Sequence, residues 1–405
     1  MALAQFPEIF STRYQDILNK ALVGKKVATT RLEAELTMGK TVHRYAIDLS
    51  GVRVRTVTRG SDQVIDPVTD SDQTLVINQE KAANFPIYRW DEVQLSPLKP
   101  ARKAGKEVAL KLSRYIDGSI LAEVRNATND FDTGDLTTMS SNGTPIVVTT
   151  TNIPALVTRA AAKLDRFNVE EDQRVWVLDP YTIAVIAQHA IGKDLNMSEN
   201  ILKNGFSGNL FGWEVYKSNN LTAEAVLSLA TNPTNGDTVT INGVVFTFET
   251  SLSATAGSLN IGTAVDDTRL NFANALNAPD TAITETATAG YTPVSSANQL
   301  ALFDLRIAAT DSASANTLTI VATGASRLVL AETLTDATDA CSKNMIHDIA
   351  GRKGFTDVVI QDGITTEMRA EPKQLTMNCL NNVLFGIKTF SDGAIRMLDL
   401  LVDAN

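Results

Sequence analysis

Residues Trp90–Arg125 read WDEVQLSPLKPARKAGKEVALKLSRYIDGSILAEVR and contain one long amphipathic pattern. Proline suits the first turn of a helix, so a helix is expected to begin at Pro97 or at Pro100. Small and apolar residues then recur with the three-to-four spacing of a single helical face, at Ala101, Gly105, Val108, Leu112, Ile116, Ile120 and Val124. The opposite face carries Arg102, Lys103, Lys106, Lys111, Arg114 and Asp117. A helix of about 25 residues spans roughly 37 Å, so we expect it to be the spine of the fold, with Val108, Leu112, Ile116 and Ile120 buried.

The totals are those of a globular protein. The chain has 405 residues, of which 44% are hydrophobic and 20% charged, and this length favours about two or three domains. It has no run of about 18 apolar residues, so no transmembrane helix is expected. The N-terminus lacks the basic start and apolar stretch of a secretory signal. The two cysteines, Cys341 and Cys379, are expected to be free thiols.

The net charge of −10 is concentrated in one internal segment. Residues Thr222–Ala340 contain twelve acidic and three basic side chains, a net charge of −9, which leaves −1 for the rest of the chain. The segment is also rich in Thr, Ala and Ser. Such a step in composition predicts a separately folded, well-solvated module.

The N-terminal part predicts an arm followed by an extended ribbon. Helical periodicity appears in Tyr14–Leu22 and in Thr30–Leu36. Val42–Leu49 and Val52–Val57 then alternate as strands do, with Gly51 as the break, and Gln73–Asn78 returns as a further strand. A long ribbon without its own core is barely stable alone. Because nothing nearby in the chain offers a packing surface, we expect a partner subunit to supply one.

The residues after the spine predict one α/β layer that the acidic segment interrupts. On one side of the interruption come a loop with strand-like Ile146–Thr149, a helix over Pro154–Phe167 capped by Asn152, a strand at Arg174–Leu178, a helix over Tyr181–Ile191 and a strand at Gly212–Ser218. Inside it come a hairpin over Thr238–Phe248 turning at Asn242-Gly243, a strand near Leu259–Ile261, a helix over Asp266–Leu276 and strands at Leu305–Ala309 and Leu318–Ala322. The layer resumes with Phe355–Ile360, Val383–Lys388 and Ile395–Leu401.

The motifs that carry chemistry are weak throughout. Met38–Thr41 resembles the end of a phosphate-binding loop, but Ala34 stands where the first glycine belongs. Asp130–Asp135 spaces carboxylates like a calcium turn, yet it lacks the distal glutamate, so an acidic loop is the favoured reading. The histidines His43, His189 and His347 are isolated from other metal ligands. We therefore expect no catalytic, cofactor-binding or metal-binding residues, no cofactor and no enzyme activity.

The order of these elements resembles that of the major capsid protein of tailed bacteriophages, which has the HK-97-type fold. The stretches that carry the likeness are Val42–Phe85 as extended loop, Trp90–Val124 as spine helix, Val175–Pro180 as a strand-to-helix step of the peripheral domain, and Phe211–Leu221 as the entry to the axial domain. The resemblance implies an α+β fold with an arm over 1–45, an extended loop over 46–95, a spine with peripheral and axial domains over 96–221 and 341–405, and an insertion domain over 222–340. Gly236–Gly243, Ile261–Ala264 and Ala273–Asn277 of the insertion are similar to small add-on domains of phage tail and capsid proteins.

The resemblance also implies a function. It is self-assembly, as pentamers and hexamers, into the icosahedral capsid that encloses double-stranded genomic DNA, with assembly in the host bacterial cytoplasm and no membrane. A separate scaffolding protein and a portal are the implied partners, and the DNA contacts are non-specific. Some relatives crosslink a loop lysine to a neighbouring subunit, and Lys81 is the only lysine between Leu49 and Phe85. Two alternatives remain open, an encapsulin-type shell that encloses protein cargo and an enzyme with an unrecognised site.

Overall fold

The computed structural model describes residues 23–33, 39–48, 51–88, 100–191, 209–277, 290–371 and 376–404, apart from positions 58, 61, 63, 64, 211, 326, 337 and 338. Within these ranges the chain is α+β, which confirms the predicted class, and its strands form four sheets. The chain divides into two compact units. One contains Ala28–Leu112 and Thr356–Phe390, and the other contains Leu22–Val27, Ser113–Phe355 and Ser391–Asn405. No helix in the described ranges combines the length and the hydropathy that a membrane span needs.

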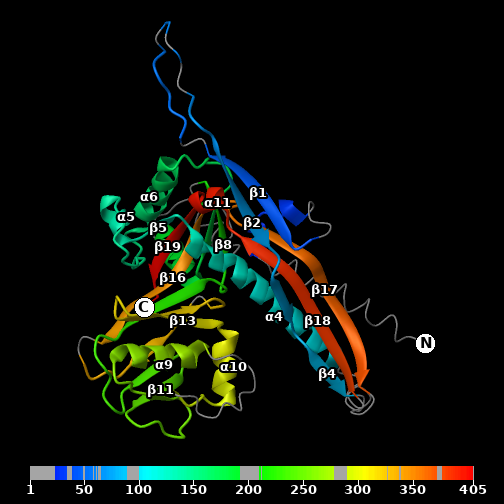
Figure 1. Cartoon of the computed structure of the whole chain (residues 1–405), viewed down its shortest axis with the longest axis vertical. Helices are drawn as coiled ribbons and strands as arrows, with labels where there is room; N and C mark the ends of the chain where they lie inside the picture. Colours follow the sequence, from blue (N-terminus) through cyan, green and yellow to red (C-terminus); the bar gives the residue numbers. More distant parts are fainter. Residues whose placement is uncertain are drawn as a thin grey trace. The chain divides into compact units, whose positions relative to one another are not determined.

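The first unit contains a four-stranded antiparallel sheet and a two-stranded ribbon (Figure 1). The sheet consists of β3 (Gln79–Ala82), β4 (Phe85–Tyr88), β17 (Asp357–Glu371) and β18 (Thr376–Lys388). β17 lies along one edge of β18, while β3 and β4 share its other edge. The ribbon pairs β1 (Thr41–Asp48) with β2 (Thr69–Val76) over eight positions, from Thr41 opposite Val76 to Asp48 opposite Thr69.

The ribbon confirms the predicted excursion but corrects two of its details. Val52–Val57 is not a strand, and Gly51 is not a tight turn between two paired strands, because β1 pairs with the return strand β2 instead. Before the ribbon, the described part of the predicted Thr30–Leu36 helix contains the 3₁₀ turn η1 (Arg31–Glu33). Residues 34–38 and the predicted helix Tyr14–Leu22 lie outside the described residues.

The second unit is organised around the central strand β16 of a nine-stranded sheet. On one side β16 pairs first with β9 and then with β6, and on its other side it pairs with β19. The strands of this sheet are β5 (Asn129–Phe131), β6 (Arg174–Leu178), β7 (Asn209–Leu210), β8 (Trp213–Lys217), β9 (Thr222–Ser228), β13 (Ile307–Ser312), β14 (Thr317–Ala322), β16 (Ala340–Arg352) and β19 (Met397–Asp403). Both faces of the sheet are covered around β6, which is why all five residues of that strand are buried.

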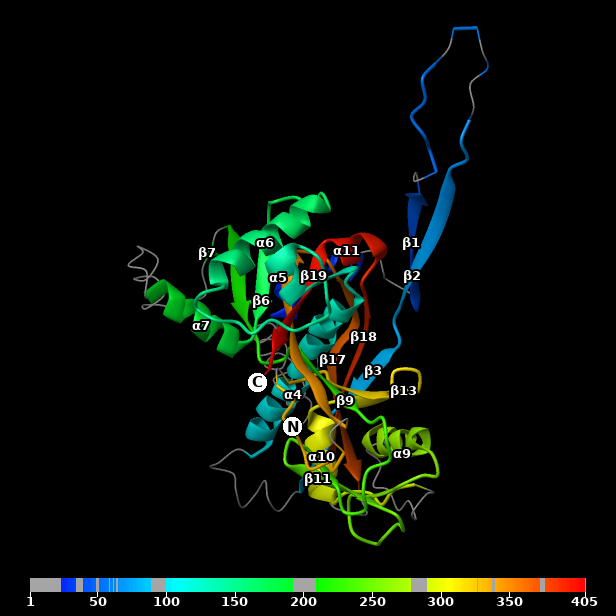
Figure 2. The same cartoon turned by 90° about the vertical axis from the view of Figure 1, so that its left-hand side faces the viewer.

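Helices cover one face of this sheet, as Figure 2 shows for α6 and α7 beside β6. The helices are α5 (Thr133–Thr138), α6 (Ile153–Arg166) and α7 (Pro180–Ile191), and the short α11 (Ser391–Ile395) precedes β19 in the chain. Leu156 and Leu164 of α6 pack in one core cluster with Trp176 of β6, whereas the alternate residues Val175 and Val177 belong to a cluster with the end of the spine helix. This alternation follows from the period of two along a strand. The predicted strand Ile146–Thr149 is reduced to a single bridge between Ile146 and Val402.

The acidic segment contributes to two sheets. β9, β13 and β14 belong to the nine-stranded sheet, while β10 (Thr238–Ile241), β11 (Val244–Glu249), β12 (Ser258–Asn260) and β15 (Leu330–Glu332) form a separate four-stranded one. The predicted hairpin is confirmed, and Asn242 and Gly243 at its turn have φ of 47° and 85°. α9 (Val265–Asn277) packs Phe272 against Phe246 and Phe248, with ring centroids 5.2 and 5.8 Å apart. α10 is the second helix of the segment (Ser296–Asp304).

The free edge of β13 is blocked by one side chain. The amide of Asn277, the last residue of α9, donates from Nδ2 to the carbonyl oxygen of Ala309 at 2.7 Å. The same amide accepts from the N–H of Ala309 at 2.8 Å. Asn277 thus gives Ala309 the two hydrogen bonds that a neighbouring strand would give.

The spine helix is α4 (Pro100–Ala122), which continues as the 3₁₀ turn η3 (Glu123–Asn126). It begins at Pro100, one of the two predicted starts, and its 23 residues span about 34 Å. Leu112, Ile116 and Ile120 are buried as predicted, but Val108 is only partly buried. The chain passes from the first unit to the second between Leu112 and Ser113, within this helix.

The prediction that Asp117 lies on the solvated face of the spine is wrong. Asp117 is 1% exposed, and its carboxylate accepts hydrogen bonds from Gly24 N at 2.7 Å and from Asn220 Nδ2 at 2.8 Å. Burial raises the pKa of this carboxyl, and the hydrogen bonds oppose that rise. Gly24 starts the four-residue helix α2 (Gly24–Val27), and a Cβ there would lie 2.9 Å from Ile120. The second half of α4 is therefore enclosed on more than one face.

We expect Leu112→Asp to prevent stable folding, because it places an unpaired charge where the native side chain is 4% exposed. The cost is about 3–5 kcal/mol, which is a large share of the stability of a typical domain. Leu110→Asp is the matched control, since Leu110 lies on the same helix and is 39% exposed. Soluble yield and thermal unfolding of the two variants measure the difference. Equal stability of the two variants would contradict the assignment of the buried face.

Candidate assembly interface

Exposed apolar side chains are concentrated in the part of the ribbon that lies beyond its base. They are Tyr45, Ile47, Val52, Val54, Val57, Ile65 and Val68, and among them Val54 is fully exposed and Ile65 is 91% exposed. Figure 1 shows that the connection between β1 and β2 continues beyond the ends of both strands. Fully burying one such valine or isoleucine is worth about 1.5–3 kcal/mol. The outer ribbon thus has apolar surface that a contact with another molecule can bury.

One carboxylate joins the two arms of the ribbon where the strand pairing has ended. Asp66 accepts a bidentate pair of hydrogen bonds from Arg55, both at 2.8 Å, and a third from the backbone N–H of Arg53 at 2.8 Å. These donors hold the pKa of Asp66 below its ordinary value. Closer to the base, His43 Nδ1 lies 2.7 Å from Asp72 Oδ2 across the strand pair. The segments around Val54 and Ile65 are thereby tied together without a β-ladder.

The base of the ribbon packs on a remote part of its own chain, so the expectation that a partner subunit must supply its packing surface is wrong for the base. Val42, Leu75 and Ile77 are buried in one cluster with Val359 and Phe390. Gly386 of β18 permits this approach, since a Cβ there would lie 2.8 Å from the carbonyl oxygen of Val76. The need for a partner surface is therefore confined to the outer ribbon.

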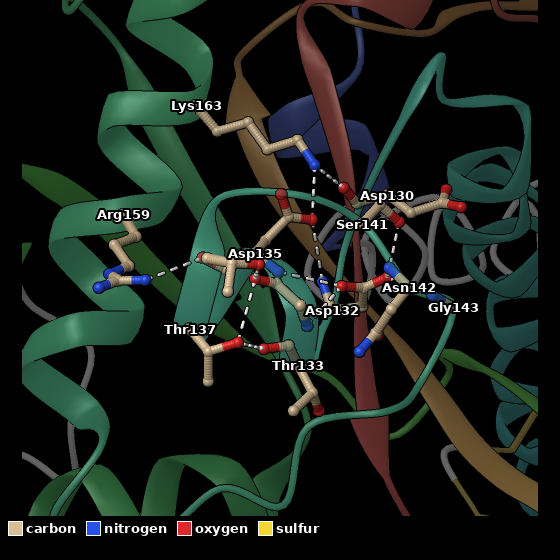
Figure 3. A network of polar contacts seen from close by, with 12 residues as sticks. Asp130, Asp132, Thr133, Asp135, Thr137, Ser141, Asn142, Gly143, Arg159 and Lys163 are labelled. Atoms are coloured by element: carbon tan, nitrogen blue, oxygen red, sulfur yellow. Dashed lines mark hydrogen bonds and ion pairs between the residues drawn. The ribbon is translucent and has the colours of Figure 1, made fainter.

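The acidic stretch Asp130–Asp135 organises a loop through hydrogen bonds to Asp132. Asp132 is buried, and Figure 3 shows its carboxylate surrounded by donors. Oδ1 accepts from Gly134 N and Asp135 N at 2.9 and 3.1 Å, and Oδ2 accepts from Ser141 Oγ, Asn142 N and Gly143 N at 2.6, 2.7 and 2.5 Å. Both oxygens are fully engaged. No group of three metal-ligating side chains occurs in the described part of the chain.

The electrostatics of this loop follow from its hydrogen bonds. Burial alone would raise the pKa of Asp132, but the bonds from Ser141 and from the backbone N–H groups hold it below its ordinary value. Asp132 also caps α5 in a reciprocal capping box with Asp135. Asp135 in turn pairs with Lys163 Nζ of α6 at 2.6 Å, an ion pair that is largely buried. The loop between α4 and α6 is thus held by an ionised carboxylate.

We expect Asp132→Ala to lower the free energy of unfolding by about 3 kcal/mol, because it leaves five donors without their acceptor. Asp172→Ala is the control, since Asp172 is exposed and its side chain has no comparable set of donors among the described residues. Urea unfolding at neutral pH measures both. Equal unfolding midpoints for the two variants would show that the loop does not depend on Asp132.

The remaining candidates for chemistry lie on different elements of the chain. Gly39 and Lys40 lead into strand β1 and not into a helix, and positions 34–38 of the candidate phosphate loop lie outside the described residues. His189 lies on α7, where its Nδ1 contacts the carbonyl oxygen of Thr150 at 2.5 Å. Both cysteines are free thiols, as predicted, and burial raises the pKa of Cys341. Lys81 lies on β3 opposite Val383, and its role in a crosslink stays a prediction.

Local hydrogen bonds correct the prediction that Asn152 caps α6. Asn152 occupies the position before α6, as predicted, but its side chain makes no capping bond to the helix. It accepts instead from Thr149 N at 2.9 Å and donates to the carbonyl oxygen of Val147 at 2.9 Å. The side chain therefore stabilises the preceding turn.

Two of the three arginines in the acidic segment are turned inward. Arg269 is fully buried and pairs with Asp311 at 2.7 Å and with Asp266. Arg306 donates to the carbonyl oxygen of Tyr115 and to Ser119 Oγ on α4, both at 2.9 Å, and its guanidinium lies 3.8 Å from the centre of the Tyr115 ring. Only Arg327 of the three is exposed. Glu224, Asp237 and Asp339 of the segment are buried as well, so its buried charges are of both signs.

The fold that positions these features is shared with a phage structure. The chain titled "Mycobacterium phage Che8" aligns over 93% of this chain and 90% of its own, with a TM-score of 0.51 and 14% sequence identity. The fold is the HK-97-type capsid fold. No family model and no curated protein matches the sequence.

Two further solved structures cover nearly the whole chain with lower scores. "Capsid structure of the Cyanophage P-SCSP1u" aligns over 94% of this chain and 87% of that one, with a TM-score of 0.45 and 11% identity. "Crystal structure of virus-like particle from Pyrococcus furiosus" aligns over 98% and 99%, with a TM-score of 0.40 and 10% identity. At such identities the likeness concerns the fold, and residue roles have to come from this chain's own geometry.

Sequence reasoning missed the groups that hold the second unit together. Asp117, Arg306 and His347 all lie in buried polar contacts, and each looks like an ordinary surface residue in the sequence. The available signal was Gly118, a glycine inside a long helix, which usually has a packing reason. A Cβ at Gly118 would lie 2.7 Å from the carbonyl oxygen of Thr323.

Proposed function

We propose that this chain is a structural protein that assembles into the icosahedral capsid of a tailed bacteriophage and encloses its double-stranded DNA. The observation that carries the proposal is the outer ribbon, which exposes seven large apolar side chains on a scaffold of the HK-97-type fold. A monomer in solution gains nothing from such a surface, whereas a repeated contact between copies buries it. No catalytic step is needed for this role.

The contact that the ribbon makes is heterologous. The outer ribbon of one copy lies against a different surface of the next copy, so the contact does not pair two identical patches. Contacts of this kind close into rings when the rotation between copies allows it. Rings of five and six copies then tile the shell. Arg55 and Asp66 keep the two arms of the ribbon together before contact, which lowers the entropy lost on docking.

The charge distribution supports an orientation for the insertion domain, which we place at residues 222–340. Its net charge of −9 is repelled by phosphate, so it should face away from packaged DNA. Basic residues of the arm and the spine then face the DNA, in contacts that are not specific for sequence. Cryo-electron microscopy of assembled particles tests this orientation, and density for 222–340 on the inner wall would contradict it.

The remaining partners belong to the assembly pathway. We propose a separate scaffolding protein and a portal, with assembly in the host cytoplasm. An encapsulin-type shell that holds protein cargo is the alternative, and it is not favoured because the chain aligned with a TM-score of 0.51 is titled as that of a phage. Material that copurifies with assembled shells distinguishes the two, since a capsid retains nucleic acid and an encapsulin-type shell retains protein.

We expect Val54→Asp to abolish assembly and leave folding intact, because Val54 is fully exposed in the isolated chain. Electron microscopy and sedimentation measure assembly, and thermal unfolding measures the fold. Val245→Asp is the control, since Val245 is a half-exposed valine of the insertion and receives the same new charge. Shells formed by Val54→Asp as readily as by the native chain would contradict the role of the ribbon. A native chain that remains a monomer or dimer under all conditions would contradict the capsid proposal itself.

A further inference from the structure

We infer that a buried ion cluster around His347 makes the second unit sensitive to alkali. The cluster consists of His347, Asp399, Glu224 and Arg125, which come from the four separate elements β16, β19, β9 and η3. The inference concerns the folded subunit and does not depend on shell assembly.

The geometry joins the four groups in a row. His347 Nδ1 lies 2.7 and 3.0 Å from the two carboxylate oxygens of Asp399. On the other side of the ring, Nε2 lies 3.6 Å from Glu224 Oε2. Glu224 Oε2 also pairs with Arg125 Nη2 at 2.8 Å. The side chain of His347 is 5% exposed and that of Asp399 is 6% exposed, so solvent screens their interaction very little.

The cluster lies across the pairing of β16 with β19 and with β9. His347 stands opposite Leu401 of β19 on one side and opposite Thr222 of β9 on the other. The side-chain contacts to Asp399 and Glu224 therefore run across the same two strand pairs as the backbone ladder. Arg125 adds the turn that ends the spine. Loss of the charge on His347 weakens both strand pairs at once.

The charges around the ring favour a cationic histidine. Two carboxylates face the ring, and Arg125 compensates only one of them. Burial alone would lower the pKa of His347, but Asp399 and then Glu224 raise it to about 9. For Glu224, burial alone would raise the pKa of the carboxyl, but its bonds to His347 and Arg125 keep that pKa below the ordinary value. Asp130 of β5 is a further carboxyl within electrostatic reach of the ring. The pKa of Asp130 is raised, first by burial and second by the charge of Asp399.

The sign of the pH dependence follows from linkage. The folded chain keeps the His347 proton up to about pH 9, while an unfolded histidine loses it near pH 6.5. The stabilisation is therefore complete below pH 6.5 and is lost as the pH rises toward 9. In between, the ratio of folded to unfolded chain falls about tenfold for each pH unit. The low pKa of Glu224 acts in the opposite direction, because its contribution is present above its ordinary pKa and is lost as the pH falls.

The test is urea unfolding from pH 6 to pH 9.5 in a Trp90→Phe background. Of the three tryptophans, this background keeps Trp176 and Trp213, which are both buried in the second unit, so their fluorescence follows that unit. We expect the reference chain to lose about tenfold in the folded-to-unfolded ratio per pH unit between pH 7 and 9. His347→Gln should be less stable at pH 6.5 and should lack this decline, so that the two curves converge near pH 9.5.

The matched control is His43→Gln, because His43 and Asp72 are also 2.7 Å apart but their side chains are 50% and 38% exposed. This variant should keep the alkaline decline of the reference chain. Glu224→Gln keeps the inference testable if His347→Gln fails to fold, since removing one carboxylate lowers the folded-state pKa of His347 and should make the decline end at lower pH. Any of three results would overturn the inference. They are a curve for His347→Gln that is parallel to that of the reference chain, a reference curve that does not change with pH, and a decline in Glu224→Gln that ends at the same pH as in the reference chain.

Discussion

The second unit depends on how the far half of the spine helix is buried. A carboxylate on a helix would normally face solvent, yet Asp117 is enclosed, and its two hydrogen bonds bring Gly24 and Asn220 to the same turn. Arg306 reaches the neighbouring turn, where its guanidinium lies on the Tyr115 ring and bonds the helix backbone. Backbone approaches as close as these require residues without Cβ on the helix surface or opposite it, which Gly24 and Gly118 provide. Segments that are remote in sequence thereby use one helix as a common surface, and the acidic segment is one of them.

Periodicity predicted the elements well and their surroundings poorly. The apolar stripe of the spine identified Leu112, Ile116 and Ile120 as buried because a helix must direct one stripe to a core. It placed Asp117 in solvent because the pattern has no information about what packs on the opposite face. The ribbon shows the same division. Alternation is common to β1 and to Val52–Val57, but only β1 has a partner strand, and pairing is a property of two segments. His347 was treated as isolated, since its partners Glu224 and Asp399 are 123 and 52 positions away in sequence.

The acidic segment is tied to the rest of its unit more closely than its composition indicates. Its first strand, β9, is registered with the start of β16, so that Ser228 stands opposite Ala340. The chain therefore leaves and re-enters the central sheet at neighbouring positions, which is the geometry that tolerates an insertion. Between those points it adds β13 and β14 to the same sheet and sends Arg306 to the spine. The step in composition correctly marks where the acidic segment lies, because this segment differs from the rest of the chain in its solvated surface. The step does not indicate that strands of the segment belong to the nine-stranded sheet.

The side chain of Asn277 has a consequence for association. An uncovered sheet edge accepts strands from any chain, so a protein that exists at high local concentration risks indiscriminate edge-to-edge aggregation. Asn277 occupies both hydrogen-bonding groups of Ala309 on the outer edge of β13, and a second strand would have to displace it. Asn277 thereby hinders strand addition at this position of the edge, while the outer ribbon stays exposed. In the proposed assembly, Asn277 restricts contacts at Ala309 of β13, while the outer ribbon offers the contact between copies.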